Sequence, residues 1–175
     1  IKADADKKWD LPTEIPNQID YTRTFGNVQG NAFFSAKWFL NKNQDVTQLL
    51  AENQYKFPAV PAAVPNFKKL VFDVPRVTSV IKEKNELVIT LQPTRNNVRY
   101  VVFYGTDTNS MINSDDPSQI IDRFFIHKNN NRLSIRVPIN SIENKSKFAL
   151  SYIDYYGNES KEIITQLPKS VVKNN

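Results

Sequence analysis

The chain contains no cysteine, a single histidine and no long apolar run. Without cysteine it cannot form disulfides, hold zinc through thiolates or use a thiolate nucleophile. Its histidine, His127, has no second histidine with which to share a metal, so a structural or surface role is favoured and no metal or other cofactor is expected. No apolar run approaches the roughly 18 residues that a membrane span requires, and we expect no such span.

The composition nevertheless allows a packed core. The 175 residues are 40% apolar, which suits one ordinary domain or a small domain with a piece of another. The net charge of +5 could indicate nucleic-acid binding. However, Lys and Arg occur in ones and twos among acidic residues, so we expect a solvated surface and no nucleic-acid partner. The opening IKADADKKWD is charged and does not resemble a signal peptide.

Short runs with alternating apolar and polar residues fill residues 75–167. Turn signals such as Asn96-Asn97 separate these runs, a pattern typical of a β-sandwich. We expect six or seven strands, the first over residues 77–80 and the last over 163–165. The alternating positions expected to be buried are Leu87, Ile89, Leu91, Leu133, Ile135, Leu150 and Tyr152.

Residues 1–67 have a different pattern, in which helical and strand periods alternate. Thr13 can cap a helix over residues 13–24, where Ile15 and Ile19 lie one turn apart on the same face. A short apolar run over residues 31–36 predicts a strand buried on both faces.

A second helix is expected over residues 45–54. Asp45 can cap it, and Val46, Leu49 and Leu50 recur at helical spacing. Pro58, Pro61 and Pro65 follow and predict an extended segment, because dense prolines fit neither a helix interior nor a central strand. We therefore divide the chain into 1–67, a linker 68–74, a sandwich 75–167 and a polar tail 168–175.

Residues 148–160, FALSYIDYYGNES, resemble the penultimate strand and turn of fibronectin type III domains. Asp154 can bond local backbone there, Gly157 accepts a positive φ, and Asn158 tolerates the turn. The resemblance implies an immunoglobulin-like sandwich of that type. Phe148 stands where such domains usually carry a corner tyrosine, and Leu91 is nearest to their usual tryptophan.

The first 67 residues resemble the end of the barrel in glycosyl-hydrolase-like family 10 proteins. That family closes a (β/α)8 barrel with a helix, a Gly-led strand ending in Phe-Ser, a last helix and a Pro-rich exit, and a sandwich domain often follows. The resemblance implies a mainly β chain preceded by an α/β barrel end. The positions that carry it are Trp9, Glu14 to Ile19, Arg23, Gly30, Phe33-Phe34-Ser35, Leu49-Leu50, Tyr55, Pro58-Ala59 and Pro61.

A barrel of this kind needs roughly 250 residues, so the resemblance implies that this chain is the C-terminal part of a larger glycosidase-like protein. The resemblance implies two partners, a glycan substrate of the intact protein and the missing barrel portion of the same protein. It also implies that the protein is located in the periplasm or at the cell surface of a bacterium. Ser35, Lys37 and Trp38 would line the barrel mouth and contact sugar, although packing of Trp38 on the last helix is the simpler alternative.

Glycoside hydrolysis normally needs two placed carboxyl groups, and we identify no catalytic pair in this sequence. Asp45 is better explained as a helix cap than as a catalyst. Asp115-Asp116 lack a calcium-loop pattern, and Asp116 is expected to cap a short helix that starts at Pro117.

Three functions remain open for the chain. It could be the inactive end of a carbohydrate-cleaving enzyme, a glycan-binding module, or a sandwich that supports the barrel or contacts other proteins. A coplanar, exposed set among Trp38, Tyr104, Tyr155 and Tyr156 would favour glycan binding, whereas burial of all of them would favour the structural role.

Overall fold

The computed structural model describes residues 11–28, 30–33, 39, 44–65, 67, 74–94, 98–107, 110–127, 133–165 and 167. The chain divides into two compact units, Ile1–Lys56 and Phe57–Asn175. This division falls ahead of the proline-rich segment, whereas sequence patterns placed the boundary after it, at residue 67. The two units are described separately below.

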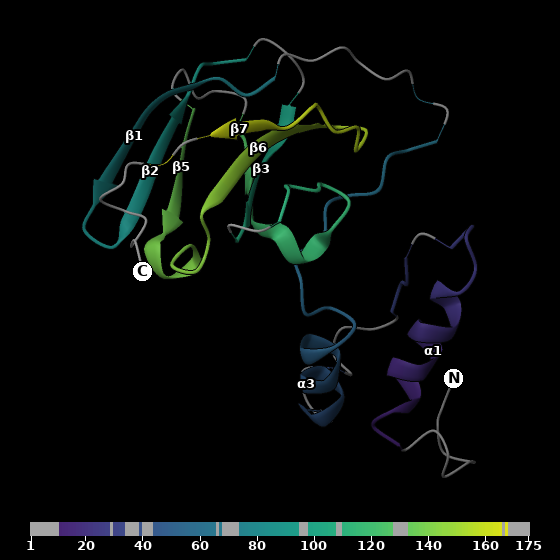
Figure 1. Ribbon diagram of the computed structural model, residues 1–175. Helices are drawn as coiled ribbons and strands as arrows, with labels where there is room; N and C mark the ends of the chain where they lie inside the picture. Colours follow the sequence, from purple (N-terminus) through teal and green to yellow (C-terminus); the bar gives the residue numbers. More distant parts are fainter. Residues whose placement is uncertain are drawn as a thin grey trace. The chain divides into compact units, whose positions relative to one another are not determined.

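The first unit contains two helices, α1 (Glu14–Arg23) and α3 (Gln44–Glu52), close to the positions predicted from the helical spacing (Figure 1). Ile19 from α1 and Val46 and Leu50 from α3 form its buried centre, with Ile15 and Phe39 packed against them. Arg23 Nη2 also donates to the backbone oxygen of Gln54 at 2.8 Å. The two helices are therefore held together by a small apolar contact, with a hydrogen bond from Arg23 to the segment that follows α3.

Three local expectations for this unit are corrected. Thr13 occupies the N-cap position of α1, but its side chain makes no capping hydrogen bond. Asp45 lies inside the first turn of α3 and not ahead of it, where its charge still suits the positive end of the helix dipole. Residues 31–33 are not in a strand, and residues 34–36 lie outside the described part of the chain. A lone strand would have no neighbour to satisfy its backbone groups.

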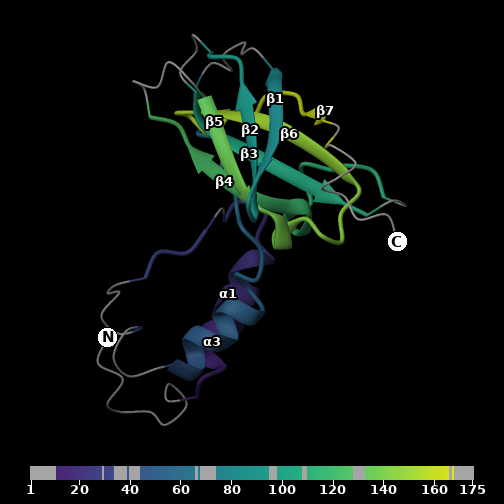
Figure 2. The same ribbon diagram turned by 90° about the vertical axis from the view of Figure 1, so that its left-hand side faces the viewer.

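The second unit is built from two antiparallel sheets, as predicted. One sheet has the order β1-β2-β5 and the other β4-β3-β6-β7, and Figures 1 and 2 show them as two layers. Each pair of neighbouring strands is antiparallel. The described strands are β1 (Val77–Glu83), β2 (Glu86–Leu91), β3 (Val98–Thr106), β4 (Ile120–Phe125), β5 (Leu133–Pro138), β6 (Lys147–Asp154) and β7 (Ile163–Thr165).

The main core lies between the two sheets. All of the alternating positions predicted to be buried are buried there. In β5 the burial pattern alternates strictly, because its second face meets water. Phe148 stacks on Phe103 with ring centroids 5.6 Å apart, so an aromatic packing contact occupies the place that the resemblance gives to a corner tyrosine.

The central strands β3 and β6 are buried on both faces. Nearly every residue of these two strands is buried or half-buried, with the first residue of β6 the exception. On the face away from the main core, Val102, Tyr104, Ala149 and Ile153 join Ile120 in a second apolar cluster. Burial on both faces means that some other part of the chain must cover this sheet.

The proline-rich segment supplies much of that cover. We call residues 57–65 the strap. Val60 of the strap packs on the second cluster, and Val64 N donates to the backbone oxygen of Tyr156 at 2.8 Å. Arg123 Nη1 donates to the backbone oxygen of Ala59 at 2.7 Å. The strap is in neither a helix nor a strand, and it is bonded to the sandwich.

The strap meets the sandwich at the turn after β6. Asp154 Oδ1 accepts hydrogen bonds from the backbone nitrogens of Tyr156 and Asn158, each at 2.8 Å. Gly157 has a φ of +79°, as the turn sequence predicted. A Cβ at Gly157 would lie 2.4 Å from the backbone oxygen of Ala62. Glycine is thus required here twice, by the backbone conformation and by the closeness of the strap.

Replacing Gly157 with alanine is expected to destabilise the sandwich by about 2 kcal/mol or more, because the left-handed φ is strained and the strap must move. Urea unfolding followed by tyrosine fluorescence measures this. Gly30→Ala is the matched control, since a Cβ there meets nothing within 4 Å. Equal stability of the Gly157→Ala variant and the wild type would contradict the close approach of the strap.

Candidate functional site

The residues proposed to line a barrel mouth, Ser35, Lys37 and Trp38, lie outside the described residues. The tyrosines proposed as an alternative sugar platform can be placed. Tyr104 is fully buried, and Tyr156 stacks on Phe67 with centroids 4.5 Å apart. These described rings do not form a coplanar exposed surface.

Two smaller expectations can also be judged. Asp116 caps the turn of 3-10 helix at Pro117–Gln119, as predicted, and its Oδ1 accepts from Ser118 N at 2.9 Å. The hydrogen bonds from Ser118 lower the pKa of Asp116. His127 is exposed, and its ring contacts that of Phe125 in a T-shaped arrangement, with ring centroids 4.9 Å apart. Both residues therefore have local roles in the described structure.

A buried polar cluster lies on the outer face of the four-stranded sheet. Tyr104 Oη and Ser151 Oγ both donate to Glu159 Oε1, each at 2.5 Å. Tyr104 and Ser151 are fully buried on β3 and β6, and Glu159 is half-buried after the turn. The carboxylate satisfies two hydroxyls that would otherwise be costly to bury. This geometry ties the end of β6 to β3, next to the apolar cluster.

The environment of Tyr104 changes its acidity. Burial of the phenol, followed by its hydrogen bond to Glu159 and the charge of that carboxylate, raises the pKa of Tyr104 above its ordinary value. The raised pKa keeps the hydroxyl protonated and donating, which suits a structural bond. A buried tyrosine with a raised pKa is a poor general base at neutral pH.

A cationic and aromatic cluster lies at the β4 edge of the same sheet. The guanidinium carbon of Arg99 lies 5.5 Å from the ring centroid of Tyr100 and 5.9 Å from that of Tyr155. The guanidinium carbon of Arg123 lies 5.8 Å from the ring of Tyr100. Two positive charges therefore share the ring of Tyr100. Phe125, opposite Tyr100 in the strand register, is half exposed and contacts it edge to face.

The hydrogen bonds of these two arginines are largely unmade within the described chain. Arg99 Nε is buried and has no hydrogen-bond partner there. Arg123 uses one described side-chain bond, to the backbone oxygen of Ala59. Neither arginine forms a salt bridge to a described carboxylate. We call Arg99, Tyr100, Arg123, Phe125 and Tyr155 the arginine cluster.

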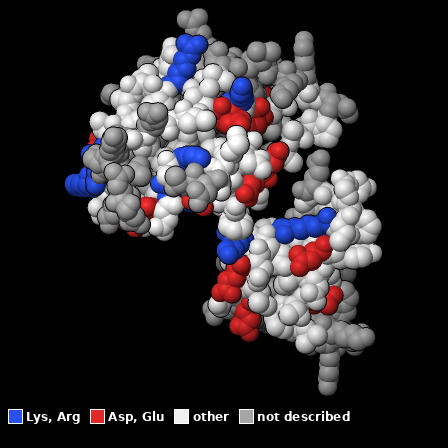
Figure 3. Space-filling model, in the orientation of Figure 1, with Lys and Arg blue, Asp and Glu red and all other residues white. Residues whose placement is uncertain are grey.

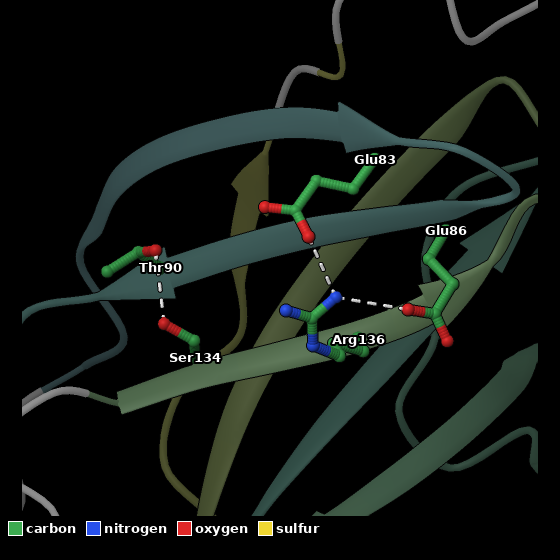
Figure 4. Close-up of polar contacts among 5 residues, drawn as sticks. All are labelled: Glu83, Glu86, Thr90, Ser134 and Arg136. Atoms are coloured by element: carbon green, nitrogen blue, oxygen red, sulfur yellow. Dashed lines mark hydrogen bonds and ion pairs between the residues drawn. The ribbon is translucent and has the colours of Figure 1, made fainter.

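Arg136 on the other sheet provides the contrast. Its Nη1 lies 2.9 Å from Glu83 Oε2 and 3.1 Å from Glu86 Oε2, as Figure 4 shows. Both carboxylates point toward it from neighbouring strands, so its charge is neutralised within the chain. Over the face in Figure 3, Lys and Arg are likewise scattered among Asp and Glu. Among the described arginines, Arg23, Arg76, Arg99 and Arg123 form no salt bridge, and what sets Arg99 and Arg123 apart is that both lie near the ring of Tyr100.

Other site types find little support in the described residues. They contain no group of three His, Asp or Glu side chains that could hold a metal. None of the described helices is long and apolar enough to cross a membrane. A cavity of about 150 Å³ lies beside Tyr152 and Arg76, below the several hundred Å³ typical of ligand pockets. Two larger hollows, of about 440 Å³ beside Arg23 and about 680 Å³ beside Arg136, are lined mainly by charged and amide side chains and not by the apolar groups typical of such pockets.

Little in the sequence indicates either cluster. Arg99 and Arg123 are far apart in the chain and lie near the same ring, that of Tyr100, because β3 pairs with β4. Glu159 reaches Tyr104 through the turn after β6, where the sequence pattern had assigned it only to a loop. The one usable signal was the alternation in β3, which places Tyr100, Val102 and Tyr104 on one face.

No protein-family model, no curated protein and no solved structure matches this chain. The class of protein that the described structure defines is therefore a mainly β protein with two antiparallel sheets and a helical segment before them. An inference about the function of this chain therefore has to be argued from its own residues and their contacts.

The Tyr104 bond predicts a pH-dependent stability. Since the pKa of Tyr104 is raised in the folded state, the folded chain keeps this proton where the unfolded chain loses it. The contribution is complete below the unfolded value of about 10 and is lost as the pH rises above it. We expect Tyr104→Phe to cost about 2 kcal/mol at pH 8.

Above pH 10 this difference should shrink by up to about 1.4 kcal/mol per pH unit, as urea unfolding at several pH values would show. Tyr21→Phe is the control, because Tyr21 is 67% exposed. A difference between Tyr104→Phe and wild type that does not change between pH 8 and pH 11 would contradict the assignment.

Proposed function

We propose that this chain is the C-terminal, non-catalytic part of a glycoside-hydrolase-like protein, and that its fibronectin type III-like sandwich supports the barrel. The observation that carries the proposal is the bonded strap. In the family that the first unit resembles, a Pro-rich exit follows the last barrel helix. Here the segment after α3 is bonded along the sandwich through Ala59, Val64 and Tyr156. A sandwich that binds this exit along its own surface is suited to support a barrel that precedes it.

The strand order is consistent with the sandwich type. In immunoglobulin-like sandwiches the second-last strand lies between the third strand and the last one. The order β4-β3-β6-β7 has this arrangement, with β1-β2-β5 as the opposing sheet. The turn after β6, with Asp154 and Gly157 in the roles expected of them, is further support.

The first unit has the character of a piece of a larger body. Among the residues that the structure describes there, the buried centre consists of Ile19, Val46 and Leu50, which is small for an independent domain. Many of its large apolar side chains are exposed: Leu11, Tyr21, Phe25, Val28, Phe33 and Tyr55. Exposed apolar surface of this kind marks a place where other structure packs.

A platform for neutral sugars is the weaker alternative. Such a site needs open aromatic faces, but Tyr104 is buried and Tyr156 is stacked on Phe67. The described aromatic rings therefore favour a supporting role over a flat sugar-stacking surface.

The proposal predicts that the pure chain does not hydrolyse polysaccharides, because it contributes no placed pair of carboxyl groups. Reducing-sugar release from a panel of neutral and acidic glycans tests this. The coding sequence that precedes Ile1 should in turn encode strand–helix repeats, with acidic residues at the ends of the strands.

Two results would contradict the proposal. The first is turnover by the pure chain that is abolished by mutating one of its own acids. The second is a gene in which no strand–helix repeat precedes this segment.

A further inference from the structure

We propose that the arginine cluster is a binding site for an acidic polysaccharide, one whose sugars carry carboxylate groups. The site is formed by β3, β4 and the turn after β6, and it lies wholly within the second unit. It goes beyond the supporting role, because it gives the sandwich a ligand of its own.

The first argument is the unused donor capacity. A guanidinium offers five N–H donors in a fixed fork, a geometry that matches a carboxylate. Arg99 donates none of its side-chain hydrogen bonds to a described group, and its buried Nε lacks a partner. The buried Nε is out of reach of a ligand from solution, so a carboxylate would accept from the terminal N–H groups of the guanidinium. Arg123 retains donors beyond its single bond to Ala59.

The second argument is the electrostatic arrangement. Arg99 and Arg123 both lie near the ring of Tyr100, and the described residues add no ion pair to either. The rings of Tyr100 and Tyr155 stabilise the nearby charges through cation–π contacts, but they do not neutralise them. An anion bound at this place gains from two positive charges at once.

The third argument is the shape of the surface. β4 is an edge strand, paired only with β3 among the described strands. Arg123 and Phe125 alternate along it on the face that carries Tyr100. A polymer lying along this edge meets a charge and then an aromatic ring, and the exposed ring of Phe125 can pack on the apolar face of a sugar.

The choice of a glycan among anionic polymers rests on the proposed function. A nucleic-acid site would show several stacking rings and a longer run of basic residues. Here the described basic cluster consists of two arginines, and the +5 net charge is otherwise scattered over the chain. Recognition of regularly spaced carboxylates fits this arrangement better.

The test is isothermal titration of the whole chain at low salt with three probes: polygalacturonate, the same polymer fully methyl-esterified, and single-stranded DNA. We expect binding to polygalacturonate and none to the ester, which has the same backbone without the charge. DNA should bind more weakly than polygalacturonate. Added salt should weaken the binding, because the contact is ionic.

Matched variants locate the site. Arg99→Gln and Arg123→Gln should each weaken polygalacturonate binding about tenfold, the loss expected for a charge-assisted hydrogen bond. Arg136→Gln removes the same charge from the opposite sheet and should leave the affinity within about twofold. Thermal unfolding monitors each variant. If Arg99→Gln unfolds, Arg123→Gln and Arg99→Lys carry the test, because Arg123 is exposed and lysine keeps the charge without the fork.

The inference fails if Arg136→Gln weakens binding as much as Arg123→Gln, since net charge alone would then explain it. It also fails if the ester binds equally well or if DNA binds more tightly than polygalacturonate. These outcomes are separate from those of the proposed function. Polygalacturonate binding at Arg99 and Arg123 would stand even if no barrel precedes this segment, and the barrel could exist without such binding.

Discussion

The two central strands of the four-stranded sheet have to be covered on both faces, and most of the second unit follows from this. β3 and β6 place Phe103, Leu150 and Tyr152 toward the main core and Val102, Tyr104 and Ile153 away from it. A strand with apolar residues on both sides cannot face water on either of them. The chain meets part of this requirement with its own proline-rich segment, which is hydrogen-bonded at Ala59 and Val64 while Val60 packs on the second cluster. The strap is therefore part of the sandwich, although it precedes the first strand.

The same sheet also carries the two polar clusters described above. Toward the β7 side, Tyr104, Ser151 and Glu159 form a closed set in which each hydroxyl has a partner. Toward the β4 edge, Arg99 and Arg123 remain without a described counter-charge. The hydrogen-bonded hydroxyls stabilise the fold, whereas the arginine cluster has positive charge available for a ligand. On the three-stranded sheet, by contrast, the charge of Arg136 is neutralised by ion pairs with Glu83 and Glu86.

Sequence periodicity predicted the sandwich well, because alternation of residues such as Leu133, Ile135 and Val137 reports directly on a half-buried strand. It also predicted the two helices and the glycine turn, which depend on local spacing and local dihedral angles. It did not predict the second cluster, since Ala149 and Ile153 look the same whether they meet solvent or a strap. Prolines mark the strap as extended, but they do not say whether an extended segment is free or bonded. The pairing of Arg99 with Arg123 depends on the register of two strands, and a single sequence does not contain that information.

The contact between the strap and the turn at Gly157 has a consequence for the order in which the protein is assembled. The strap leaves the ribosome before any strand of the sandwich, yet its partners Tyr156 and Gly157 are made only after strands β1 to β6. Closing so long a loop costs entropy that only the finished sheet can offset. The bond from Val64 to Tyr156 therefore cannot form until β6 and its turn have been synthesised. During that interval its prolines are protective, because a proline-rich segment cannot add itself as a regular strand to the growing sheet edge or to another chain.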